Sequence, residues 1–325
     1  MGIALIVGNG LFFDLLRQSG VSISDWHPSN PTLWTNPALV AGGDTVLSQL
    51  PRFDRFISQW RQNEQLSDFA IFDRIVRGAA PNIDFYADRN EPIPERYRRK
   101  LTAVEARHFL VVSLGHAQVN LVDTLNLQAW RWCQWLEKHR NRLRAITSFN
   151  YDLILESALR EAGVEYRRSA LEQERRGVPI HKPHGSIDFV MRQNLIAGVE
   201  PEYPLRNLIF ANNAPQQRVE NLVAPRLDAE IVLPAEASDI GHYQWVRVGV
   251  QEWRNNVANA TDLVLVGLSY WRCDEEELDK LVDAVPRNCN VHICNPSPSI
   301  VWIQKLMNRF GRSNVHCISD GPPDI

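Results

Sequence analysis

The stretch Ala145-Ile146-Thr147-Ser148-Phe149-Asn150-Tyr151-Asp152 decides the fold, together with His181-Lys182-Pro183-His184-Gly185-Ser186 a short interval later. An apolar run stops at a polar tip, and apolar residues then recur at helical spacing, which predicts a buried strand, a loop and a helix. This layout places a site at the carboxyl end of a parallel strand. The two stretches supply a carboxamide, a carboxylate and an imidazole. A plain turn, with Asp152 capping the helix, is the alternative.

A similar strand, turn and helix opens the chain. Residues 2–7 are apolar and lead into Gly8-Asn9-Gly10, after which leucines repeat at helical spacing. A helix N-terminus after such a strand is an anion site, and glycines let a diphosphate approach the backbone. Phe13 stands where the dinucleotide fingerprint has its third glycine, which disfavours an ordinary dehydrogenase. A glycine turn without a ligand stays open as the alternative.

Further apolar strands end in the same manner. Leu263–Val266 leads to Gly267-Leu268-Ser269, and Val291–Cys294 leads to Asn295. Between them, Asp274 followed by Glu277 predicts a capping-box start for a helix. Strands alternating with helices indicate an α/β fold: a Rossmann-like, doubly wound, mostly parallel sheet. The carboxyl ends of such a sheet face one crevice, so we expect these tips to converge with those at Gly8–Gly10 and Asn150–Asp152.

The segment between the first two strands differs in character. Proline, glycine and tryptophan mark residues 25–52 as irregular, and residues 81–94 are loop-like too. Residues 53–77 and about 95–140 carry apolar residues at helical spacing. We therefore predict a sheet domain of residues 1–24 and 141–325, interrupted by a helical insertion at 25–140 that folds over the site as a lid.

Composition narrows the classes of function. The 325 residues carry a formal net charge of −3 and are 44% hydrophobic, as in ordinary globular proteins, which gives no support for nucleic-acid binding. No stretch approaches the roughly 20 apolar residues of a membrane span, and residues 1–20 do not read as a secretory signal. We expect a cytoplasmic protein without membrane contact. The five cysteines form no Cys-x-x-Cys pair, so we predict no zinc ribbon. His181 and His184 are metal-binding residue types, but no further His or Cys lies nearby, so we predict no metal site.

Taken together, the motifs resemble those of the sirtuin-like superfamily. The matching stretches occur in the family's order, within about residues 1–20 and 143–320. Gly8-Asn9-Gly10 resembles the family's nucleotide turn, Ser148–Asp152 its Thr-Gln-Asn-x-Asp motif and His184-Gly185 its catalytic His-Gly. Gly267–Asp274 resembles its later Gly-x-Ser segment, and Asn295-Pro296 its adenosine-side turn.

Departures from the family narrow the resemblance. Sirtuin deacylases carry paired Cys-x-x-Cys motifs, which are missing here, and Phe149 replaces the glutamine of their motif. Both differences argue against protein deacylation. The chain looks more like the bacterial sirtuin-like NADases of antiphage defence, which share Gly-Asn-Gly, an Asn-Tyr-Asp type motif and Lys-x-His-Gly-Ser. This resemblance implies that the family's catalytic residues correspond to Asn150 and His184.

The resemblance implies a reaction and a set of contacts. NAD is the substrate, no metal takes part, and the nicotinamide–ribose bond is hydrolysed. His184 is expected as the general base and Asn150 as the group that orients water or the ribose. Expected NAD contacts, from the diphosphate to the nicotinamide amide and the adenosine side, are Gly8, Asn9, Gly10, Asp152, Gly267, Ser269 and Asn295.

A second class of function fits the same residues. In this alternative the chain is a non-catalytic module that senses NAD or ADP-ribose and acts through a partner protein. His184 is then a binding or structural histidine. In either case, control is expected to come from a homo-oligomer or from a separate regulatory protein.

Overall fold

The structure is a computed structural model. It describes residues 2–22, 40–41, 44–45, 109, 111–119, 122–171, 176–190, 216–217, 222, 229–232, 243–270 and 274–325. The helical segment predicted at 53–77 and the loop predicted at 81–94 lie outside the described residues, as does most of the segment at 25–52.

The chain folds as two compact units. The first comprises Met1–Val21, Leu125–His184 and Ser238–Ile325, and the second comprises Ser22–Thr124 and Gly185–Ala237. The described strands of the second unit form a short antiparallel pair and a three-stranded antiparallel sheet in the order β8-β7-β9: β2 (Val40–Ala41), β3 (Asp44–Thr45), β7 (Gly185–Val190), β8 (Gln216–Gln217) and β9 (Ala229–Ile231). That residues 25–140 act as a lid stays a prediction.

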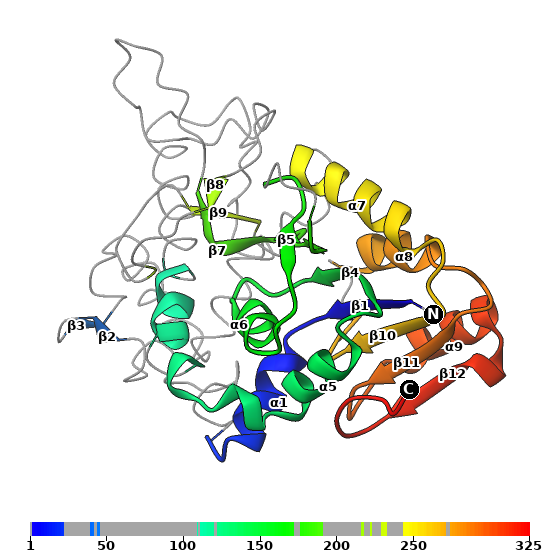
Figure 1. Ribbon diagram of the computed structural model, residues 1–325, viewed down its shortest axis with the longest axis horizontal. Coiled ribbons are helices and arrows are strands. Elements are labelled where there is room, and N and C mark those ends of the chain that lie inside the picture. Colours follow the sequence, from blue (N-terminus) through cyan, green and yellow to red (C-terminus); the bar gives the residue numbers. More distant parts are fainter. Residues whose placement is uncertain are drawn as a thin grey trace, which may run out of the picture. The chain divides into compact units, whose positions relative to one another are not determined.

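The first unit is built on a seven-stranded sheet in the order β12-β11-β10-β1-β4-β6-β5 (Figure 1). Every neighbouring pair in it is parallel. Its strands are β1 (Ile3–Val7), β4 (Leu143–Ser148), β5 (Tyr166–Arg168), β6 (Val178–His181), β10 (Asp262–Val266), β11 (Asn290–Cys294) and β12 (Val315–Ile318). The chain lays strands on one side of β1 and then on the other, which confirms the predicted α/β fold class.

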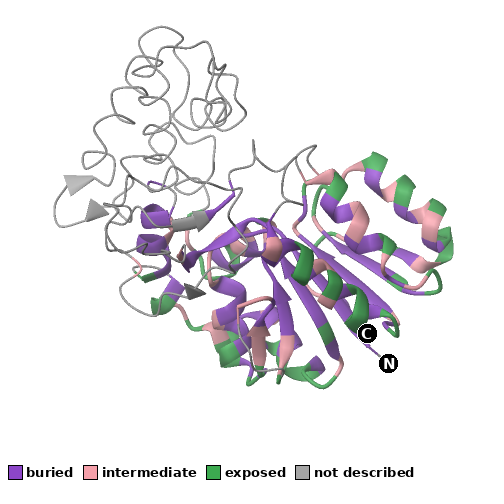
Figure 2. Cartoon of the chain, turned by 90° about the horizontal axis from the view of Figure 1, so that it is seen from above, coloured by how far each residue is buried: buried purple, intermediate pink, exposed green. Residues whose placement is uncertain are grey.

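Helices cover both faces of this sheet (Figures 1 and 2). They are α1 (Gly10–Gln18), α5 (Arg131–His139), α6 (Ile154–Glu161), α7 (Gln244–Val257), α8 (Glu275–Asp283) and α9 (Ile300–Phe310), with short 3₁₀ turns at Val122–Thr124, Leu127–Ala129 and Arg312–Asn314. The last three helices share one apolar core with alternate residues of the strands, such as Leu263 and Leu265 of β10. Within the described parts of the chain, no helix has both the length and the apolar character to cross a membrane.

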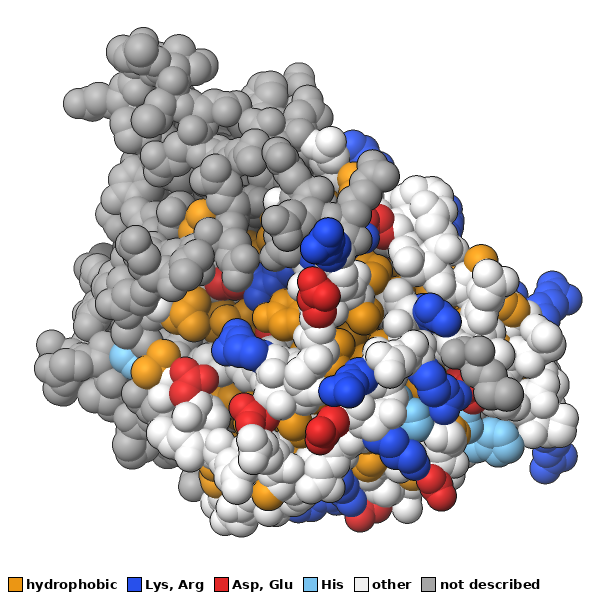
Figure 3. Space-filling model, in the orientation of Figure 1, with side chains coloured by type: hydrophobic (Ala, Val, Ile, Leu, Met, Phe, Trp, Pro, Cys, Tyr) orange, Lys and Arg blue, Asp and Glu red, His pale blue; other side chains and the backbone are white. Residues whose placement is uncertain are grey.

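The strand ends of the sheet lie at one level. Val7 of β1 is in register with Ser148 of β4 and with Val266 of β10, and Thr147 of β4 is in register with His181 of β6. The polar and glycine residues that follow these strands therefore lie along one edge of the sheet. On the described surface in view, acidic and basic side chains are interspersed (Figure 3).

Backbone meets backbone where β1 and β10 end. Gly10 N donates to Gly267 O at 3.1 Å, and Gly8 N donates to Val266 O at 2.9 Å. A Cβ atom on Gly10 would lie 2.4 Å from Gly267 Cα, so there is no room for a side chain. Gly267 also has a positive φ of 59°. The glycine turn of the sequence is thus required for close packing.

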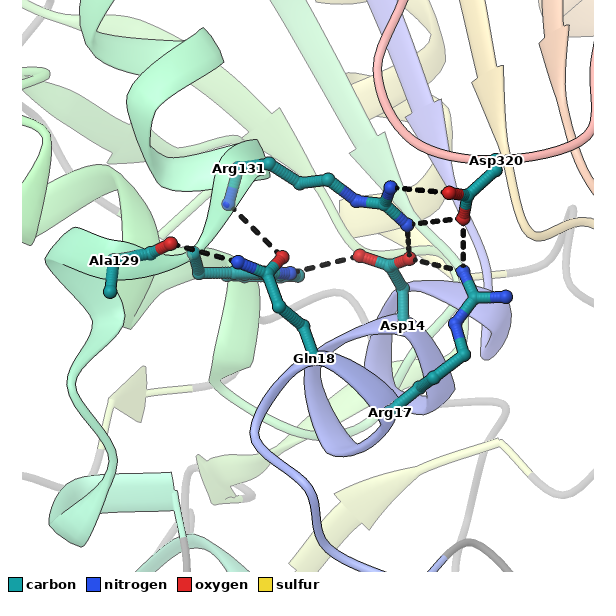
Figure 4. Close-up of polar contacts among 7 residues, drawn as sticks. Asp14, Arg17, Gln18, Ala129, Arg131 and Asp320 are labelled. Carbon is teal, nitrogen blue, oxygen red and sulfur yellow. Dashed lines mark hydrogen bonds and ion pairs between the residues drawn. The ribbon is translucent and has the colours of Figure 1, made fainter.

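A buried carboxylate joins α1 to α5 and to the segment after β12 (Figure 4). Asp14 accepts hydrogen bonds from Arg131 at 2.5 Å, Arg17 at 2.8 Å and Trp130 Nε1 at 2.9 Å. Both arginines also donate to Asp320, at 2.5 to 2.8 Å. Burial raises the pKa of Asp14, but these hydrogen bonds outweigh burial and hold that pKa below its usual range.

The glycine contact gives a first prediction. Gly267→Ala adds a Cβ that would lie 2.3 Å from Gly10 Cα, and we expect it to lower the free energy of unfolding by about 3 kcal/mol. The matched control is Gly163→Ala, because Gly163 has a similar φ of 63° and nothing within 4 Å of its Cβ position. The control is expected to cost about 1 kcal/mol. Equal losses of the two variants in urea unfolding would contradict the steric explanation.

Asp14 gives a prediction about pH. Because its folded pKa is lowered, its stabilisation is fully present above the unfolded pKa of about 4 and is lost as pH falls through the folded value. We expect Asp14→Asn to cost about 2 kcal/mol at pH 7 and progressively less towards pH 2, measured by urea unfolding. Asp324→Asn, which removes only an exposed partner of Lys138, is the control and is expected to change stability little at any pH.

Candidate functional site

Asn150 follows the end of β4 and is buried, with 2% of its surface exposed. Its side-chain Nδ2 donates to Gly8 O at 3.1 Å, and its backbone N–H donates to Ser148 Oγ at 3.3 Å. These contacts fix the carboxamide plane. Its Oδ1 has no hydrogen-bond partner among the described residues. The carboxamide is therefore oriented by its nitrogen, and its oxygen stays available to accept a hydrogen bond.

His184 lies in the turn that follows β6 and is 4% exposed. Its ring packs edge-on against Phe149, with centroids 5.2 Å apart, and lies 6.0 Å from the ring of Tyr151. These are the two neighbours of Asn150 in the chain. The structure thus brings together the two stretches on which the sequence prediction depends.

Asp274 is a partner of this imidazole that the sequence reasoning missed. Its Oδ1 lies 3.3 Å from His184 Nε2, although neither atom has the alignment of a hydrogen bond. Asp274 is the N-cap residue of α8, so the predicted start of this helix is confirmed, but its side chain does not make the hydrogen bond of a capping box. Its carboxylate faces His184 instead. The position of α8 after the β10 tip, at the same edge as Asn150, was the available signal.

The surroundings of His184 set its protonation. Burial lowers the pKa of the imidazole, whereas the Asp274 carboxylate and a hydrogen bond to the Phe149 backbone raise it, and burial prevails. The ring is therefore neutral near pH 7. His181, on the preceding strand, is also buried, and burial together with His184 lowers its pKa to about 3.

Asp152 lies one residue before Leu153, the N-cap residue of α6, and its side chain supports the turn that leads into this helix. Its Oδ1 accepts a hydrogen bond from Ile154 N at 3.1 Å, at the start of α6. Burial raises the pKa of this carboxyl to about 6, against the lowering effects of Lys182 and the Ile154 hydrogen bond. Its side chain thus supports the turn that carries Asn150, and contact with a nicotinamide amide stays a prediction.

The glycine turn presents few free donors. Gly10 N, Leu11 N and Phe12 N donate to protein carbonyls at 3.0 to 3.1 Å, and Asn9 is exposed at the tip. A diphosphate at this turn would compete with those carbonyls for the N–H groups. Diphosphate binding by Gly8, Asn9 and Gly10 therefore stays a prediction.

The tips of β10 and β11 are tied to each other. Asn295 Nδ2 donates to Leu268 O at 2.8 Å, and its Oδ1 accepts from Ser297 N at 3.0 Å. Gly267 N donates to Cys294 O at 3.0 Å, while Ser269 is exposed. Asn295 thus has a structural role as a turn residue. Adenosine-side contacts by Gly267, Ser269 and Asn295 stay predictions.

Buried polar atoms without partners gather at the ends of β4 and β6. Within the described residues, the atoms that lack a hydrogen bond there are Thr147 Oγ1, Asn150 Oδ1, His181 Nε2 and His184 Nε2. Thr147 and His181 are in register on adjacent strands. The His181 ring packs against Gly249 of α7, where a Cβ would lie 1.9 Å from its Nδ1. Since buried polar groups are normally paired, this group of atoms fits a place for water or a polar ligand.

Among the residues described, no set of three or more His, Cys, Asp or Glu side chains is arranged to hold a metal ion. The donor set at the site is a carboxamide, imidazoles and a hydroxyl, which suits hydrogen bonding to a neutral or polar organic group.

The chain is only weakly similar to known proteins. No protein-family model matches the chain, and no curated protein matches it. Among solved structures, it is similar to a mutant Sir2 homologue in complex with 2′-O-acetyl ADP-ribose, at 11% sequence identity and a TM-score of 0.37, over 98% of this chain and 86% of that chain.

The Asp274 contact leads to a prediction about His184. Asp274→Asn removes a carboxylate that raises the pKa of His184, so we expect that pKa to fall further below its ordinary value, as followed by NMR titration of the imidazole. Asp279→Asn is the matched control, because this aspartate of the same helix pairs with Lys305. A His184 pKa that is unchanged or raised in Asp274→Asn would show that the carboxylate does not act on the ring.

Proposed function

We propose that the chain hydrolyses the nicotinamide–ribose bond of NAD. The observation that carries this proposal is that the buried atoms Asn150 Oδ1 and His184 Nε2 make no hydrogen bond among the described residues, on turns that contact each other at the carboxyl edge of a parallel sheet. Unpaired buried polar atoms are costly, and a bound substrate would supply their partners. The order of the sirtuin-like motifs supports NAD as that substrate.

Each residue has a defined role in the reaction. The C–N bond between the ribose and nicotinamide breaks, and its electron pair leaves with the nicotinamide. The ribose thereby becomes oxocarbenium-like. Asn150 Oδ1 accepts a hydrogen bond from the attacking water or from a ribose hydroxyl and so orients it. Neutral His184 takes the proton as water adds to the ribose carbon. The nearby Asp274 carboxylate stabilises the imidazolium that forms.

The biological setting is part of the same proposal. The resemblance to sirtuin-like NADases of antiphage defence supports an effector that depletes NAD once it is triggered. Such an enzyme needs control, which we assign to a homo-oligomer or a separate regulatory protein.

One observation favours the alternative of a sensor without catalysis. The His184 ring hydrogen-bonds to the backbone of Phe149, and its Nε2 faces the Asp274 carboxylate. The protein itself therefore contacts the imidazole from two sides. A histidine held in this way also suits a binding role. In that case, the chain binds NAD or ADP-ribose and releases no nicotinamide.

Nicotinamide release from NAD tests the proposal. We expect His184→Ala and Asn150→Ala each to reduce the rate on the order of 10²–10⁴-fold. His316→Ala and Asn256→Ala replace exposed residues of the same types and are expected to retain the rate. Undiminished release by both site variants would refute the assignment. NAD binding by calorimetry without any release by the wild-type chain would select the sensor.

A further inference from the structure

A buried ion pair lies directly beneath the candidate site. Lys182 follows β6, and its side chain has 0% of its surface exposed. Its Nζ donates to Glu156 Oε1 at 2.9 Å and to the backbone carbonyl of Asp152 at 2.5 Å. Glu156, on α6, is 1% exposed, and Arg168 of β5 approaches the same carboxylate oxygen at 3.4 Å.

These contacts join the two turns that carry the candidate site. Lys182 stands two positions before His184, and the carbonyl that it binds belongs to the turn that contains Asn150. Glu156 is fixed in the first turn of α6, whose first residue, Ile154, donates its backbone N–H to Asp152 Oδ1. One ammonium group therefore links the turn after β6 to the turn and helix after β4, across 30 residues of sequence.

Burying two charges is a poor way to gain stability. Removing a lysine and a glutamate from water costs more than a well-packed apolar pair, so replacing such a pair is often neutral for folding. What the pair does provide is geometry, because an ammonium with two fixed acceptors has one position. The ring contacts of His184 with Phe149 and Tyr151 depend on the turn that this ammonium holds.

We propose that Lys182 and Glu156 are a positioning pair, which holds the imidazole of His184 against the segment that carries Asn150. The proposal deepens the function proposed above and rests on it for the role of His184. Neither residue touches substrate. Each acts through the position of the histidine.

The main test replaces the whole pair. Lys182→Met with Glu156→Leu removes one charge of each sign, so the net charge near His184 is unchanged. Buried Arg168 also loses its contact with Glu156 in this variant, so we expect the protein to fold with lower stability. We expect the pKa of His184 to rise towards its ordinary value near 6.5 as the ring loses burial, and kcat to fall about 100-fold at a similar KM. NMR titration of the ring reports the first effect without any need for NAD.

The matched control replaces a second ion pair of the same sheet. Arg167 of β5 and Glu252 of α7 lie 2.8 Å apart and are partly buried, and this ion pair joins β5 to α7 rather than one turn to the other. Arg167→Met with Glu252→Leu is expected to leave the His184 pKa and kcat unchanged. Equal behaviour of the two double variants would overturn the proposal.

Two single variants keep the test decisive if the double variant does not fold. Glu156→Gln and Glu156→Leu remove the same charge, but only glutamine keeps an oxygen that accepts from Lys182. We expect the leucine variant to have the higher His184 pKa and the lower kcat, with glutamine restoring most of the rate. Identical values would overturn the proposal. If the wild-type chain releases no nicotinamide while the pKa difference appears, the positioning stands and the proposed hydrolysis fails.

Discussion

The direct contact between the backbones of Gly10 and Gly267 is the constraint on which the first unit depends. It lets β1 and β10 end side by side at the centre of the sheet and lets α1 begin at once. The seven strands of this sheet are parallel, so the position at which β1 and β10 end also sets where the neighbouring strands end. Asn150 then reaches Gly8 O with its side chain, and the tips of β10 and β11 are tied through Asn295. The absence of a side chain at Gly10 and at Gly267 thus allows the strand ends to form the edge that carries the candidate site.

At this edge, structural and chemical roles can be separated by asking where each polar atom finds a partner. The Asp152 side chain accepts a hydrogen bond from the backbone at the start of α6, and the Asn295 side chain accepts one within its own turn. Asn150 and His184 each leave one buried atom without a hydrogen bond in the described chain. Buried polar atoms in native proteins nearly always form a hydrogen bond, to the protein, to water or to a ligand. The distinction explains why residues of similar type, at similar places on neighbouring strands, receive different roles in the proposed reaction.

The sequence predicted most of the sheet, because buried parallel strands are continuous apolar runs that stop at glycine or polar residues. The strands at Ile3–Val7 and Asp262–Val266 lie close to their predicted positions. What it could not predict are contacts between distant residues. The approach of Asp274 to His184 and the bond from Lys182 to Glu156 depend on how the segments meet in space. For Asp274, the local pattern pointed to a helix cap, and a long-range charge contact prevailed.

Gly249 has a consequence for engineering this protein. A glycine inside a helix is a usual target for stabilisation, because alanine favours the helix by about 1 kcal/mol. Here the missing side chain makes room for the His181 ring, which lies where a Cβ atom would stand. A design procedure that scores helices by propensity would choose this position first and would push apart α7 and the strand that leads to His184. Thermostabilised versions of the chain should therefore keep residue 249 fixed.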